Sequence, residues 1–107
     1  MEILKDKGQP IVIFGKEYKL TISLKTLQLM AEKLGPLEEL RLNIETVPEI
    51  LALMIQDYFR KHPDEELDSD ATDPDTLRDY LTPEDVQELT KFIFSMLNPS
   101  NSDGKNA

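Results

Sequence analysis

The chain contains no cysteine and no tryptophan, and its 107 residues include only four glycines and one histidine. Without cysteine there is no disulfide framework, no thiolate nucleophile and no metal site that needs cysteine ligands. The four glycines lie far apart in the sequence, so no glycine-rich loop is available to hold a phosphate group. With no catalytic motif in view, we expect a protein that is not an enzyme and needs neither cofactor nor metal ion.

Long apolar runs are also missing. The longest, Ile50 to Ile55, has six residues, whereas a membrane-spanning helix needs roughly 20. The opening residues MEILKDKGQP lack the apolar segment of a signal peptide. We therefore expect a cytoplasmic protein with no membrane association.

Positive charge is scarce: the chain has 12 basic and 21 acidic residues, and its formal net charge is −9. Nonspecific binding to nucleic acid needs a basic surface, so this balance argues against it. Three interpretations stay open: the charge keeps the protein soluble, it imitates nucleic acid, or it steers a basic partner to an acidic surface.

The first third of the chain predicts a β-hairpin over about residues 11–22. Ile11–Phe14 is β-branched and aromatic, as in a strand, and Gly15–Glu17 supplies a short polar connection. Two strands alone are marginally stable in water, so the hairpin should lie on helices. The alternation of the second strand places three apolar residues on the covered face: Tyr18, Leu20 and Ile22.

Amphipathic helices are predicted over about residues 24–34 and 47–62. Ser23 can cap the first, and Gly35 followed by proline ends it. Thr46 and Glu49 have the spacing of a capping box at the start of the second. This second helix is apolar almost all round, which is typical of a central, buried helix.

The second half of the chain predicts an acidic loop over residues 64–75, a short helical turn from Pro74 to Leu81, and a helix over 83–97 that is capped by Thr82. Leu37–Ile44 fits either a strand or a helical turn.

Together these elements predict a small α+β fold that is mostly α. One domain over residues 1–98 would pack the hairpin on about three main helices, and residues 99–107 would form a disordered tail.

The acidic loop and the single histidine are the two candidates for a chemical site. A calcium loop begun at Asp68 would need glycine at its sixth position and glutamate at its twelfth, where this chain has Asp73 and Asp79. A solvated acidic loop is therefore the preferred interpretation, with a weak divalent-ion site as the alternative. His62 lies near the end of a predicted helix, where a positive charge is favoured and a structural role is sufficient.

Three large apolar residues leave the helical stripes: Leu29, Phe92 and Phe94. They either widen the core or line an exposed groove for a partner helix or a second copy of the chain. We take them as the candidate partner-binding residues.

The order of elements resembles the small tail assembly chaperones of long-tailed, siphovirus-like bacteriophages and prophages. The resemblance rests on Gly15–Leu20, Leu27–Gly35, Val47–Phe59 and Thr82–Leu97. It implies a protein of the bacterial host cytoplasm that binds the helical tape-measure protein and assists assembly of the tail-tube protein, without catalytic residues. Self-association would be compatible with this role.

The family often makes a longer product by ribosomal frameshifting, and Lys105–Asn106 can be encoded by a slippery AAA-AAC. The alternatives to the chaperone are an acidic inhibitor that imitates nucleic acid and another phage morphogenesis protein such as a head–tail adaptor.

Overall fold

The computed structural model describes residues 10–98 and has an α+β fold that is mostly α, as predicted. The elements follow one another in this order: β1 (Pro10–Ile13), β2 (Lys16–Lys19), α2 (Leu24–Leu34), the 3-10 helix η1 (Leu37–Glu39), α3 (Thr46–Lys61), α4 (Pro74–Tyr80) and α5 (Pro83–Leu97). The expected tail over 99–107, with its Lys105–Asn106 dipeptide, and the first nine residues of the expected domain lie outside the described residues.

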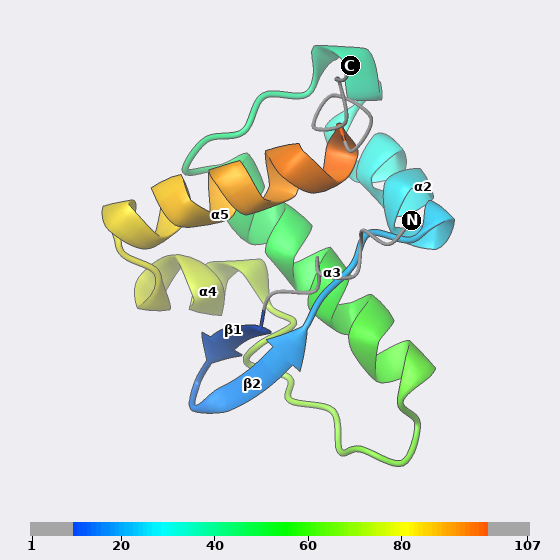
Figure 1. Ribbon diagram of the computed structural model, residues 1–107, viewed down its shortest axis with the longest axis vertical. Helices are drawn as coiled ribbons and strands as arrows, with labels where there is room; N and C mark the ends of the chain where they lie inside the picture. Colours follow the sequence, from blue (N-terminus) through cyan, green and yellow to red (C-terminus); the bar gives the residue numbers. More distant parts are fainter. Residues whose placement is uncertain (1–9, 99–107) are drawn as a thin grey trace, which may run out of the picture.

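Helix α3 is the centre of the fold, as its apolar sequence predicts. Its residues from Ile50 to Ile55 are all buried, and it packs against α2, α4 and α5. The hairpin lies to one side of the same helix, and the segment between β2 and α2 passes across it (Figure 1). The ring of Tyr18 in β2 makes edge-on contacts with Tyr58 and Phe59 of α3, at centroid distances of 5.0 and 5.8 Å. The hairpin is therefore stabilised by helices, as expected for two strands that cannot stand alone.

The hairpin turn lies one residue earlier than the sequence indicates. The strands are antiparallel, with Ile13 opposite Lys16, so the two turn residues are Phe14 and Gly15, and the predicted Gly15–Glu17 connection is wrong. Both turn residues have positive φ, 52° for Phe14 and 79° for Gly15. A two-residue turn of this kind matches the twist of the strands. The unusual Phe14 conformation is held by Tyr80, whose ring lies 4.4 Å from that of Phe14 and whose hydroxyl oxygen accepts the Phe14 N–H at 3.3 Å.

The start of α3 also differs from its prediction, because Thr46 and Glu49 form no capping box. The side-chain oxygen of Asn43 accepts hydrogen bonds from the N–H groups of Glu45 and Thr46, at 2.9 and 3.0 Å. Glu49 turns instead to α4, where its carboxylate lies 3.0 Å from the guanidinium of Arg78. Asn43 therefore supplies the cap that the sequence assigned to Thr46.

The other helix ends agree with their sequence signals. Ser23 caps α2, and Gly35, with φ of 93°, ends it. Thr82 and Asp85 form a reciprocal capping box at the start of α5. The ambiguous Leu37–Ile44 segment forms η1 and then an irregular stretch that contains no strand.

Candidate functional site

The clearest candidate for a binding site is an apolar groove of about 780 Å³ between α2, the segment after it and the C-terminal half of α5. Its lining is apolar apart from Glu38, Thr90 and Asn98, and no lysine or arginine of the described residues takes part. The apolar lining consists of Ile22, Leu27, Leu37, Leu40, Leu42, Phe94, Met96 and Leu97. We call this feature the α2–α5 groove.

One wall of the α2–α5 groove is built by the way α2 ends. The Gly35 N–H donates to the Ala31 carbonyl at 3.1 Å, and glycine accepts the positive φ that turns the chain out of the helix. Proline at position 36 prevents the helix from continuing. The chain then passes through η1 and presents Leu37, which is 39% exposed, before Leu40 and Leu42 pack partly on the core.

The opposite wall is the last two turns of α5. Ile93 is fully buried, and Phe94 follows it about 100° further round the helix, so its side chain leaves the core. Phe94 is 56% exposed, while Met96 and Leu97 are partly buried against the core. An exposed phenylalanine beside a mostly apolar hollow is an unusual surface for a small acidic protein.

The structure separates the three residues that the sequence singled out. Phe94 lines the α2–α5 groove. Phe92 is partly buried and lines a different, smaller cavity beside β1. Leu29 lines neither hollow and packs partly against the core, in line with the first of the two interpretations.

Sequence reasoning missed the wall formed by Leu37, Leu40 and Leu42. The sequence does show three apolar residues here, but they lie in the segment that fits either a strand or a helical turn, so their common face could not be predicted.

Asp57 is the most buried charged residue among those described, at 5% exposure. Burial opposes its ionisation, but hydrogen bonds from Arg60 and Lys61 outweigh this effect and bring the pKa of Asp57 below its usual value. The Lys61 ammonium lies 3.2 Å from its carboxylate. These pairs lie along one helix and outside the α2–α5 groove, so they are structural.

His62 ends the same helix, as its sequence position indicates. Its Nδ1 lies 2.7 Å from the Tyr58 carbonyl oxygen, and its ring stacks on Tyr58 at 4.2 Å. A structural role accounts for these contacts.

The acidic loop is not fully solvated, because several of its side chains form an ion pair or hydrogen bonds with the rest of the protein. The Lys16 ammonium lies 2.8 Å from the Glu65 carboxylate and keeps the pKa of Glu65 below its usual value. The Tyr58 hydroxyl donates to the same carboxylate at 3.0 Å. Asp68 accepts the Asp70 N–H at 3.0 Å, and Ala71 is fully buried.

Several loop carboxylates therefore bind groups of the protein itself. Within residues 10–98, no three histidine, cysteine or acidic side chains are grouped so as to hold a metal ion.

Comparison of the chain with protein-family models, with curated proteins and with solved structures finds no match in any of the three. Over residues 10–98, the helices are too short or too polar for any of them to cross a membrane.

Proposed function

We propose that this protein is a non-enzymatic tail assembly chaperone of a long-tailed bacteriophage or prophage. In the host cytoplasm it binds amphipathic helices of the tape-measure protein in the α2–α5 groove, keeps their apolar faces from aggregating and assists assembly of the tail-tube protein. The observation that carries the proposal is the apolar groove with the exposed Phe94 at its wall.

The chemistry of the α2–α5 groove suits a helix. An α-helix with its side chains is about 10–12 Å wide and buries an apolar stripe when it lies in a groove. The polar face of the bound helix would remain outside, next to a body with a net charge of −9 and near Glu38 at the groove. A partner helix with basic residues beside its apolar stripe is therefore favoured over an acidic one.

The direct test is truncation of Phe94 with a matched control. A phenylalanine buries roughly 150–250 Å² when fully covered, and slightly more than half of Phe94 is still exposed. At about 25 cal/mol per Å², covering the rest is worth roughly 2–3 kcal/mol, or about 30- to 150-fold in affinity. Leu67 is the control, because it is 57% exposed and lies in the acidic loop, away from the groove.

The measurement is the dissociation constant of a labelled helical tape-measure fragment for the wild type, Phe94→Ala and Leu67→Ala. The proposal expects the loss in Phe94→Ala alone, with unchanged thermal stability of both variants. Equal affinity of the two variants, or no binding by the wild type, contradicts it.

A further inference from the structure

The free edge of strand β1 borders a second cavity, which lies on the other side of α5 from the α2–α5 groove. In the described part of the chain β1 pairs with β2 alone. All four residues of β1 line this cavity of about 310 Å³, together with Leu81 after α4 and Asp85, Glu88 and Phe92 of α5. We call this feature the β1-edge cavity.

The register shows which backbone groups of β1 point to its free edge. Ile13 and Lys16 flank the two-residue turn and form a hydrogen-bonded pair, so the next pair, Val12 with Glu17, is a non-hydrogen-bonded one. The N–H and C=O of Val12 are then directed away from β2. Exposed edge groups of this kind are a template for a further strand.

The tip of the hairpin is fixed while this edge stays open. The Tyr80 hydroxyl oxygen accepts the Phe14 N–H, and the Tyr80 ring contacts the Phe14 ring at a tilt of 41°, which ties the turn to the end of α4. An incoming segment would therefore meet a prearranged edge and would not have to order the hairpin itself.

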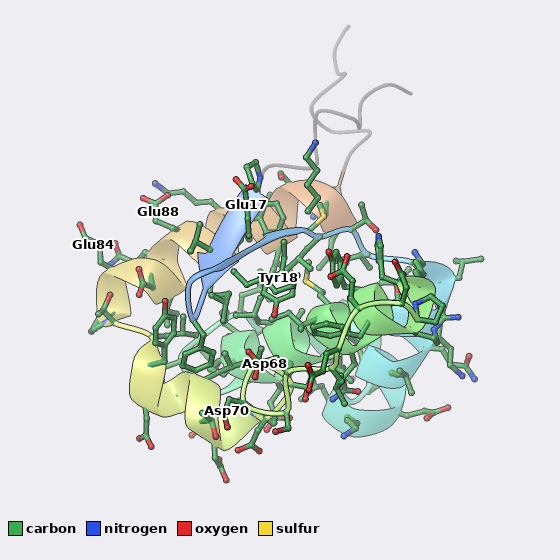
Figure 2. All side chains as sticks on the ribbon, turned by 90° about the horizontal axis from the view of Figure 1, so that it is seen from below. Glu17, Tyr18, Asp68, Asp70, Glu84 and Glu88 are labelled. Carbon is green, nitrogen blue, oxygen red and sulfur yellow. The ribbon has the colours of Figure 1, made fainter. Side chains whose placement is uncertain are left out.

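Charge identifies the kind of segment that fits. Asp85 and Glu88 bring two carboxylates to the β1-edge cavity, and no lysine or arginine from residues 10–98 lines it. Figure 2 shows Glu88 and its neighbour Glu84 on α5, beside the hairpin. Asp85 also serves the cap of Thr82, whereas Glu88 forms no ion pair with another residue of the described part of the chain. Leu81 and Phe92 offer apolar contacts between these charges.

We propose that the β1-edge cavity binds an extended basic segment of a partner protein by strand addition. The segment pairs with the Val12 backbone, and its lysine or arginine side chains face Glu88 and Asp85. This surface is separate from the α2–α5 groove, and the inference holds whether or not the groove binds a helix.

The test uses the full chain and a labelled peptide of four Lys-Val repeats, with four Glu-Val repeats as the charge control. Val12→Pro removes the outward N–H without touching the bonds to β2, since proline is tolerated on an edge strand. Glu88→Gln removes the Glu88 carboxylate, and Glu84→Gln is its matched control on the same helix, outside the cavity lining.

Binding of the Lys-Val peptide should slow hydrogen exchange of the Val12 N–H in the wild type. Val12→Pro should weaken binding by roughly tenfold, the effect of losing about one hydrogen bond. Glu88→Gln should weaken it more than Glu84→Gln does, and the difference should shrink at high salt.

Several outcomes overturn the proposal. These are equal binding of the Glu-Val peptide, full affinity in a folded Val12→Pro variant, or equal effects of the two glutamine variants. Protection of the Val12 N–H from hydrogen exchange in the free protein would also overturn it. If removal of residues 1–8 abolishes that protection, the edge is occupied by the chain's own segment. If dilution abolishes it, the edge is occupied by a second copy.

Discussion

Replacing Tyr18 by phenylalanine should make this protein more stable. Tyr18 is fully buried, and its hydroxyl is the one buried side-chain polar group of residues 10–98 without a hydrogen-bond partner. Figure 2 shows the residue in the interior, between the hairpin and the loop that carries Asp68. Burial raises the pKa of Tyr18, so the group is a neutral hydroxyl held away from water without compensation.

The magnitude follows from what the substitution keeps and removes. Phenylalanine keeps the ring and its edge-on contacts with Tyr58 and Phe59. It removes a buried unsatisfied hydroxyl, which costs about 1–3 kcal/mol. We expect a gain near the lower end, about 1 kcal/mol, because the lost oxygen leaves a small gap. For a domain of this size that gain raises the Tm by roughly 4–8 °C.

The assay is urea unfolding followed by circular dichroism, with Tyr58→Phe as the matched control. Tyr58 touches Tyr18, but its hydroxyl donates to Glu65 at 3.0 Å. Tyr58→Phe should therefore lose stability while Tyr18→Phe gains it. A loss of about 1 kcal/mol or more in Tyr18→Phe would refute the reasoning, because it would mean that the hydroxyl makes a stabilising hydrogen bond.

Two further predictions concern α3. Asn43→Ala should lower the free energy of unfolding by about 1 kcal/mol through loss of the helix cap. Thr46→Val should also lower it, because the Thr46 hydroxyl accepts the Asn43 N–H at 3.0 Å. An unchanged stability of Asn43→Ala in urea unfolding would contradict the role of Asn43 as the cap. The pKa of Asp57 is lowered in the folded state, so its stabilisation is present above the ordinary aspartate pKa of about 3.9 and is lost as the pH falls through the folded value. Asp57→Asn should therefore show a weaker fall in urea midpoint than the wild type as the pH drops from 5 to 2, and an unchanged slope would argue against this role.

Local signals allowed much of the fold to be predicted. The bounds of α2 and α5 follow from Ser23, Gly35 and Thr82, which act on the backbone within three or four residues of themselves. The hairpin turn could not be placed in this way. Phe14 takes a positive φ beside Tyr80, a residue 66 positions away in the sequence. No local sequence pattern around Phe14 predicts that contact.

The α2–α5 groove was predicted only in part, for the same reason. Phe94 could be recognised because it follows Ile93 on a helix whose buried stripe is regular. Leu40 and Leu42 lie in a segment without periodic structure, and their place in the wall depends on where Gly35 and Asn43 direct the chain. Leu29 packs partly against the core, which extends further round α2 than its main stripe indicates.

The most direct test of the central claim is to locate the bound helix by methyl NMR. A helical tape-measure fragment is added to the labelled protein, and the shifts of its methyl groups are followed. If the helix lies in the α2–α5 groove, shifts are expected at Leu37, Leu42 and Met96, which line the groove, and none at Leu67 in the acidic loop. Shifts confined to residues outside the groove, or no shifts at all, would contradict it.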